Sequence, residues 1–148
     1  MQHLAVIMDG NGRYASARGK TRAEGHIAGA QALVRLTDDF AFLPLSVITV
    51  YAFSTENFKR SEQEVGALFD TIAFFLQEKI YPLATKRGIA VRFVGNSGAL
   101  PEKVRAVMGA APRSGDKTLL IALNYGGDDE VCRAVNKALQ KGEEITVS

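Results

Sequence analysis

A glycine-containing segment near the amino terminus is the first part of the sequence whose residue types could carry out chemistry. Asp9 is followed by Gly10-Asn11-Gly12-Arg13. Glycines let backbone N–H groups approach an anion closely, and an arginine adds a planar charged donor, so the segment predicts phosphate binding. A carboxylate beside a phosphate is repelled unless a cation lies between them. Asp9 therefore predicts a Mg²⁺ ion that joins the protein to a phosphorylated ligand.

More positive charge follows this segment. Arg18, Lys20, Arg22 and His26 come soon after Arg13, and no acidic residue lies between Arg13 and Arg22. This amount of charge favours a diphosphate over a monophosphate. The alternative interpretation of the segment is a tight turn with solvated arginines.

Three functions compete for the Asp9 segment. The sequence from Gly10 to Ala15 fits the dinucleotide fingerprint G-x-G-x-x-A, but the second strand ends in Tyr51-Ala52-Phe53 where that fingerprint calls for an acid. Asp9 could be the nucleophile of a phosphotransferase, although such sites usually have a second acid two residues on, where Asn11 stands. The third function combines diphosphate binding with an apolar substrate.

Length and composition set limits on these functions. The 148 residues are 47% apolar and 23% charged, which is typical of one globular domain over residues 1–148. A net charge of +2 gives no support for nucleic-acid binding. Cys132 is the single cysteine, so we expect it to be reduced and half-buried. Because we find no signal peptide and no apolar run of about 18 residues, we expect a cytoplasmic protein.

Alternating strand and helix patterns must position the Asp9 segment. Short apolar or β-branched runs predict strands, and apolar residues at helical spacing predict helices. Ser61 and Glu64 form a capping-box signature at the start of the longest helix. The predicted strands are 3–8, 46–53, 89–94 and 118–123, and the predicted helices are 25–40, 62–83, 101–111 and 129–141.

This order predicts an α/β fold, a mostly parallel sheet with helices on both faces. We expect the first two strands to be buried. Polar loops after the four strands, at residues 9–13, 54–57, 95–97 and 124–127, should share one edge of the sheet, where ligands bind.

The two long helices carry more apolar residues than one stripe needs. Small residues in the first (Ala28, Gly29, Ala30 and Ala32) and Phe74 outside the main stripe of the second predict that the helices flank an apolar tunnel. Plain core packing is the alternative interpretation of the same periodicity.

Four segments together resemble the cis-prenyltransferases, the undecaprenyl diphosphate synthase family. The resemblance covers nearly the whole chain, with the motifs in the order and spacing of that family. The segments are HLAVIMDGNGR from His3, GHIAGA from Gly25, YAFSTENFKR from Tyr51 and NYGG from Asn124.

The resemblance implies that isopentenyl diphosphate is added repeatedly to an allylic diphosphate such as farnesyl diphosphate, giving a long-chain undecaprenyl-type product. Asp9 would hold Mg²⁺ and assist catalysis, and Ser54 and Asn57 would lie near the reacting carbons. Arg60 would lie near the second substrate, and Phe58 stands where the family often has tryptophan. The residues around the allylic diphosphate would be Gly10, Asn11, Gly12, Arg13, Arg22 and His26.

The resemblance also implies a homodimer, no nucleic-acid partner, peripheral membrane contact through the lipid product and a role in supplying a cell wall lipid carrier. Two features depart from the family pattern. A later R-x-S-G-E-x-R-x-S-N-F segment is not found, and Asp128 stands where arginine is common. The chain is therefore expected to be either a truncated cis-prenyltransferase or an accessory, non-catalytic protein that binds a prenyl diphosphate.

Overall fold

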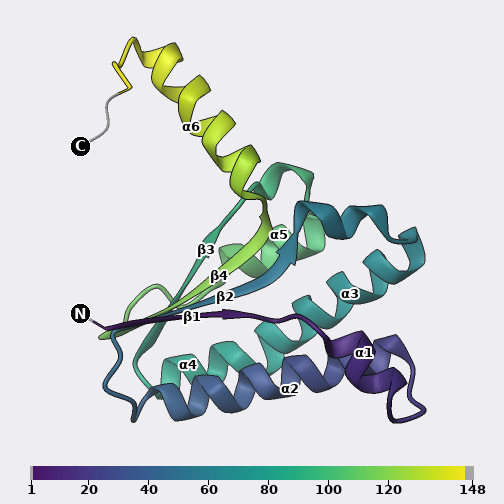
Figure 1. Ribbon diagram of the computed structural model, residues 1–148. Coiled ribbons are helices and arrows are strands. Elements are labelled where there is room, and N and C mark those ends of the chain that lie inside the picture. The colour runs from purple at the N-terminus through teal and green to yellow at the C-terminus, as the bar shows by residue number, and fades with distance from the viewer. Residues whose placement is uncertain (1, 146–148) are drawn as a thin grey trace.

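The fold is built on one parallel sheet of four strands, in the order β1-β2-β4-β3 (Figure 1). The computed structural model describes residues 2–145. Every neighbouring pair of strands is parallel, so the predicted α/β fold with a parallel sheet is confirmed. The strands are β1 (His3–Ile7), β2 (Val47–Ser54), β3 (Ile89–Val94) and β4 (Lys117–Tyr125).

Helices connect the strands, with two differences from the sequence prediction. A short helix lies inside the segment predicted as a loop after β1, and the long helix predicted over 62–83 is interrupted by a π-helical turn. The helices are α1 (Asn11–Ser16), α2 (Arg22–Phe40), α3 (Glu62–Phe75), α4 (Tyr81–Lys86), α5 (Glu102–Gly109) and α6 (Gly127–Lys141); the shorter turns are η1 (Thr55–Lys59), the π turn η2 (Leu76–Ile80) and η3 (Ser97–Ala99). Among residues 2–145, no helix has the length and apolar character needed to cross a bilayer.

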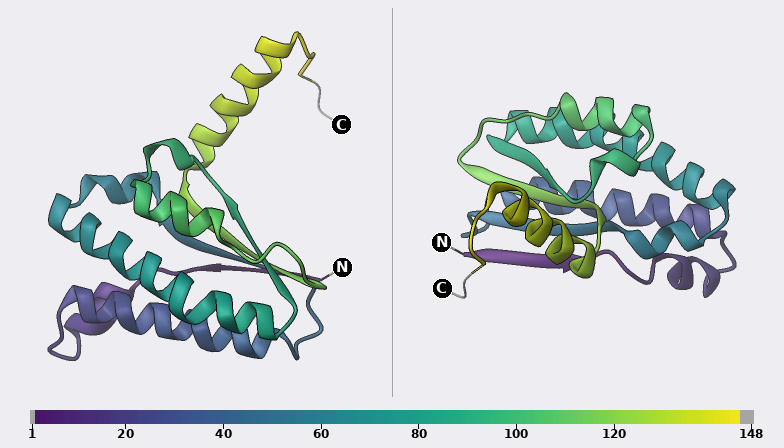
Figure 2. Two further views of the ribbon diagram at one scale, coloured as in Figure 1. Left: turned by 180° about the vertical axis from the view of Figure 1, so that it is seen from behind. Right: turned by 90° about the horizontal axis from the view of Figure 1, so that it is seen from above.

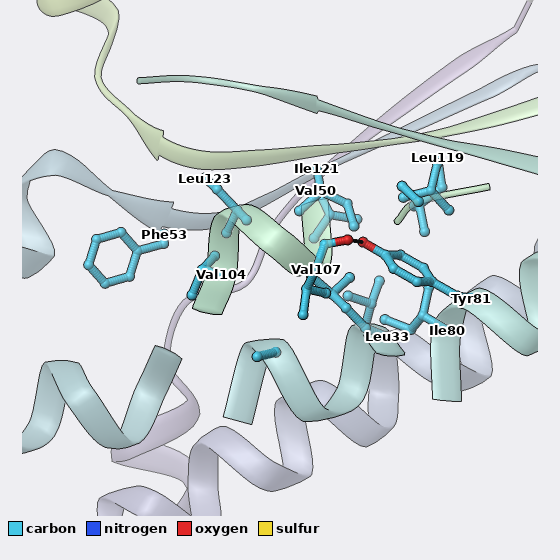
Figure 3. Close-up of a cluster of buried hydrophobic side chains, with 14 of the residues drawn as sticks. Leu33, Val50, Phe53, Ile80, Tyr81, Val104, Val107, Leu119, Ile121 and Leu123 are labelled. Atoms are coloured by element: carbon cyan, nitrogen blue, oxygen red, sulfur yellow. Dashed lines mark hydrogen bonds between the residues drawn. The ribbon is translucent and has the colours of Figure 1, made fainter. Parts of the chain in front are cut away.

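The core lies on one face of the sheet. Ile48 and Val50 of β2, and Phe53 beyond an irregularity in the strand, are fully buried and pack with side chains of α2 to α5. Figure 3 shows this cluster, including the hydrogen bond that the Tyr81 hydroxyl donates to the Val107 carbonyl at 2.9 Å. Helices therefore cover this face closely.

The second helical layer that the sequence predicts is not formed by the described residues. α6 projects away from the body of the molecule, and none of its described residues is buried (Figure 2). Cys132, predicted to be half-buried, is exposed on this helix. The residues of β2 that point away from the core, Val47, Thr49 and Tyr51, remain partly exposed.

The prediction of a buried first strand was also wrong. β1 pairs only with β2 and forms an edge of the sheet, with Leu4 and Ile7 exposed. A run such as HLAVI predicts a strand from its residue types, but the position of that strand in the sheet depends on contacts elsewhere in the chain. Exposure at the edge follows from that position.

Candidate functional site

The carboxyl ends of the strands bring the predicted loops to one edge of the sheet. Ile7 of β1 pairs with Tyr51 of β2, and the Met8 N–H donates to the Tyr51 carbonyl at 3.2 Å. Asp9 and Ser54 therefore follow neighbouring strands. The loops after β3 and β4 meet beside them, where the Asn124 amide donates to the Asn96 carbonyl at 2.8 Å. The predicted gathering of the four loops is confirmed.

A cavity of about 250 Å³ opens at this edge and extends between the sheet and helices α2 and α3. Polar side chains gather at one part of its lining: Asp9, Asn11, His26, Ser54, Asn57 and Arg60. The rest of the lining is mainly apolar, and includes Ala30, Leu33, Leu68, Ile72, Phe75, Leu76, Ile80, Ile121 and Leu123. The cavity thus joins a polar, charged region to an apolar interior.

Two glycines of α2 bring the Asn11 region close to that helix. A Cβ at Gly25 would lie 2.2 Å from the Asn11 carbonyl oxygen, and a Cβ at Gly29 would lie 2.7 Å from the Asn11 side-chain nitrogen. Only glycine leaves room for this approach. Gly29 was one of the small residues predicted to flank an apolar tunnel, but it lies against the Asn11 side chain of α1, whereas Ala30 lines the cavity.

Asp9 is the one carboxylate among the described residues that line the cavity. Its Oδ1 accepts from the Gly10 N–H at 2.6 Å, and its Oδ2 accepts from Arg13 at 3.1 Å. Gly10 has a φ of +82°, a backbone conformation that favours glycine. The Asp9 and Arg13 side chains are 78% and 82% exposed, so both are accessible to a ligand.

The end of β2 supplies the next group of polar residues. Asn57 Oδ1 accepts from the Ser54 N–H at 2.9 Å, which fixes the turn that carries both side chains into the cavity lining. Phe58 does not line the cavity. Its ring packs edge-on against Phe53, with the ring centroids 5.0 Å apart, and Phe53 does line it.

Arg60 and His26 lie at the polar part of the cavity, beside Glu64. Arg60 donates to Glu64 Oε1 at 3.0 Å, and His26 Nε2 lies 3.8 Å from the same oxygen. Arg22 reaches that oxygen at 3.5 Å from α2. Glu64 was not a predicted site residue, because the sequence analysis assigned it to a helix cap. We refer to Glu64, Arg22, His26 and Arg60 as the Glu64 cluster.

The surroundings of His26 favour its neutral form. Burial lowers the pKa of His26 below its ordinary value, and the Arg60 charge lowers this pKa further, whereas the Glu64 carboxylate acts in the opposite direction. An anion arriving at this part of the cavity favours the protonated imidazole.

Magnesium fits the donors at Asp9. Mg²⁺ prefers oxygen ligands and is commonly held by one or two carboxylates together with substrate phosphates. The exposed Asp9 carboxylate supplies one such ligand. No group of three or more His, Cys, Asp or Glu side chains that could hold a metal is found within residues 2–145, so phosphate oxygens and water would complete the coordination.

The predicted site residues fall into three groups in the structure. Asp9, Asn11, His26, Ser54, Asn57 and Arg60 line one cavity. Arg22 lies in an adjoining groove together with His26 and Glu64, and a Cβ at Gly12 would lie 3.4 Å from Arg22. Gly10, Gly12, Arg13 and Phe58 lie beside the cavity without lining it, and their roles toward a ligand stay predictions.

Sequence comparisons identify the relatives of this chain. A family model for undecaprenyl diphosphate synthases matches residues 7–148. An isoprenyl transferase from Clostridium perfringens is 38% identical over 143 residues, covering 94% of this chain and 56% of the relative. One from Leptospira interrogans is 40% identical over 140 residues, covering 92% and 58%. The chain thus spans less than two thirds of the length of these relatives.

Solved structures show the same similarity. Lavandulyl diphosphate synthase from Lavandula x intermedia, in complex with dimethylallyl diphosphate, superposes with a TM-score of 0.83 at 27% identity, covering 95% of this chain and 63% of that one. A probable undecaprenyl diphosphate synthase from Campylobacter jejuni gives a TM-score of 0.77 at 26% identity, covering 98% and 64%. The chain therefore belongs to the undecaprenyl diphosphate synthase family, which its loop motifs resemble.

Proposed function

We propose that this chain carries out cis-prenyl chain elongation, in which isopentenyl diphosphate is added to an allylic diphosphate such as farnesyl diphosphate. The observation that supports the proposal most strongly is the two-part cavity, in which a charged region with Asp9, His26 and Arg60 continues into an apolar interior. An allylic diphosphate has the same two parts, a charged head and an apolar tail. The names of the relatives, isoprenyl transferases, agree with this chemistry.

The charged region binds the diphosphate head in this proposal. Arg60 and His26 face the cavity and stabilise the negative charge that develops when the bond between the allylic carbon and the diphosphate oxygen breaks. Asp9 would hold Mg²⁺ against the diphosphate. When bound there, Mg²⁺ supplies positive charge that neutralises the phosphate oxygens. Arg13, which pairs with Asp9, lies close enough to bind the same head group.

Ser54 and Asn57 are assigned to the reacting carbons. The allylic carbon forms a bond with the terminal methylene carbon of isopentenyl diphosphate, diphosphate leaves, and one proton is lost from the newly added unit. Ser54 and Asn57 line the cavity at the end of β2 and are held relative to each other by a hydrogen bond, so they are suited to orient the carbon that loses the proton.

The apolar interior holds the hydrocarbon tail. Leu68, Ile72 and Phe75 of α3 line the cavity together with Leu33 of α2 and Ile121 of β4. Burial of an isoprenoid chain there is favourable by about 25 cal/mol per Å² of apolar surface removed from water. The same side chains keep water away from the carbocation-like carbon, which water would hydrolyse.

The proposal extends to partners and location. We assign isopentenyl diphosphate as the second substrate, a homodimer as the assembly, and a cytoplasmic location with peripheral membrane contact through a long lipid product of undecaprenyl type. Such a product would serve as a lipid carrier in cell wall synthesis.

An elongation assay tests this proposal. The chain is incubated with farnesyl diphosphate, radiolabelled isopentenyl diphosphate and Mg²⁺, and the extracted products are separated by chain length. We expect labelled prenyl diphosphates longer than the starting farnesyl compound. Farnesyl diphosphate that is bound but recovered unchanged would contradict elongation and leave only a binding function.

A further inference from the structure

Two helix starts share one sequence signature but use their glutamates differently. At α2, the Glu24 carboxylate accepts from the Thr21 N–H at 2.8 Å and from the Thr21 hydroxyl at 2.9 Å, which completes a capping box. At α3, the Ser61 hydroxyl accepts from the Glu64 N–H at 3.2 Å. The Glu64 carboxylate turns away from that cap toward the cationic side chains, so it is held by something other than the helix start.

A single oxygen of Glu64 meets all three basic side chains of the Glu64 cluster. Oε1 lies 3.0 Å from Arg60, 3.5 Å from Arg22 and 3.8 Å from His26. Arg22 and His26 belong to α2, whereas Arg60 lies between η1 and α3, next to the α3 cap residue Ser61. The cluster therefore joins the two helices that flank the cavity.

Burial makes this arrangement more than a surface ion pair. The side chains of Glu64, His26 and Arg60 are only 24%, 16% and 32% exposed. The guanidinium groups of Arg22 and Arg60 repel each other at this separation and disfavour a charge on His26, and partial burial reduces the screening by water. The Glu64 carboxylate offsets that repulsion. Its own position is in the adjoining groove, so His26 and Arg60 remain available to the cavity.

We propose that Glu64 is a positioning residue, the resident counter-ion that gathers Arg22, His26 and Arg60 into one anion site until a diphosphate takes over their charge. This inference rests on the proposed function, which supplies the diphosphate. In the free protein, the carboxylate keeps the basic groups in place. When a diphosphate is bound, its larger negative charge neutralises the same groups, and Glu64 is no longer needed to hold them.

Replacing Glu64 by glutamine separates its charge from its shape. Glu64→Gln keeps an oxygen that can accept from Arg60 but leaves the basic groups without a counter-ion. The free variant should therefore melt roughly 3 °C below the wild-type chain. Inorganic pyrophosphate, used as the probe, replaces the missing charge. We expect saturating pyrophosphate with Mg²⁺ to bring the melting temperature of the variant back to within about 1 °C of that of the pyrophosphate-bound wild-type chain.

Glu24→Gln is the matched control, because Glu24 occupies the same position of the same signature and its carboxylate accepts both hydrogen bonds from Thr21 in its own cap. The melting temperature of this variant should lie below that of the wild-type chain by the same small amount with and without pyrophosphate. If Glu64→Gln behaves as the control does, with an equal loss in both conditions, Glu64 is only a structural residue and the proposal is overturned.

Proton NMR of the wild-type chain gives a second test that needs no variant. The chain has two histidines, and His3 lies on β1, where it contacts Thr49. The groups that act on the pKa of His26 are Glu64, Arg22 and Arg60. Saturating pyrophosphate should raise the pKa of His26. A His26 resonance that titrates identically with and without pyrophosphate overturns the proposal.

The outcomes separate this inference from the function on which it rests. If farnesyl diphosphate and pyrophosphate bind the wild-type chain but Glu64→Gln matches the control, only the role of Glu64 is rejected. If neither compound binds the wild-type chain, the proposed function and this inference are both rejected.

Discussion

The Asp9–Arg13 pair and the Glu64 cluster each place a carboxylate against basic side chains, but they differ in exposure. Asp9 and Arg13 are 78% and 82% exposed and lie four residues apart in one segment. Glu64 and His26 are 24% and 16% exposed and come from different helices. The first pair is a local contact on the surface, and the second connects distant parts of the chain.

This difference indicates that the two groups of residues have different roles within one site. An exposed ion pair contributes about 0–1 kcal/mol to stability. The contact between Asp9 and Arg13 can therefore be given up with little loss of stability when Asp9 binds a metal and Arg13 binds a diphosphate. Glu64 and His26, which are largely buried, lie where α2 packs against α3. Asp9 should therefore govern binding with little effect on folding, whereas changes at the α1–α2 contact or in the cluster should affect both.

The largest effect is expected from Asp9→Ala. Because Asp9 is the carboxylate that would hold Mg²⁺, this change should weaken Mg²⁺-dependent binding of farnesyl diphosphate by about 100-fold, or about 2.7 kcal/mol. Its unfolding free energy should change by less than about 0.5 kcal/mol, because the side chain is exposed. Calorimetry and urea denaturation measure the two quantities.

Asp116→Ala serves as the control for that experiment. Asp116 precedes β4, at the edge of the sheet opposite the cavity, and should leave binding unchanged. Equal affinity in Asp9→Ala and in the wild-type chain would show that Asp9 does not hold the metal.

Gly29→Ala should disturb the contact between α1 and α2. Its Cβ would lie 2.7 Å from the side-chain nitrogen of Asn11, so the Asn11 side chain, which lines the cavity, must move. We expect a loss of about 1–3 kcal/mol of unfolding free energy, measured by urea denaturation, together with weaker binding of farnesyl diphosphate.

Gly66→Ala provides the opposite case within α3. Apart from its chain neighbours and the nearby backbone of its own helix, no atom lies within 4 Å of the position that its Cβ would take, and alanine favours the helix, so stability should rise by about 0.5–1 kcal/mol. If Gly29→Ala were equally stabilising, the close approach of α1 to α2 would be disproved.

Lysine substitutions compare the two regions directly. Arg60→Lys removes a planar donor that is fixed by Glu64 and half-buried, and should weaken pyrophosphate binding about 10-fold. Arg13→Lys keeps the charge at an exposed position and should weaken binding about 2-fold. Calorimetric titration of both variants measures the contrast. Equal losses of pyrophosphate affinity in the two variants would mean that the different burial of Arg60 and Arg13 does not affect binding.

A further small effect is a dependence on pH. The pKa of His26 is lowered in the free protein, so the unfolded chain binds a proton that the folded chain lacks, and stability falls as the pH drops below about 6.5. Bound pyrophosphate favours protonated His26. Affinity should therefore rise about 3-fold between pH 8 and pH 6. His26→Gln should lose this His26-linked part of the pH dependence, and an unchanged profile would exclude His26.

The sequence predicted the features of this fold that depend on local patterns. Alternating strands and helices imply a parallel sheet, and the loops at its carboxyl edge follow from that arrangement. It did not predict the exposure of β1, which depends on strand order, or α1, whose first residues resemble a loop because of Gly10 and Gly12. The role of Glu64 was hidden because Ser61 and Glu64 already match a capping signature, and its partners Arg22 and His26 lie far away in the sequence.

In our proposal, one cavity takes both the charged head and the apolar tail of the same ligand. Titration calorimetry of farnesyl diphosphate and of inorganic pyrophosphate, each with Mg²⁺ and at several temperatures, tests whether it does. We predict that farnesyl diphosphate binds at least about 100-fold more tightly, with a clearly negative heat-capacity change from burial of its tail. Equal affinities and a heat-capacity change near zero for both ligands would show that the tail is not buried in the cavity.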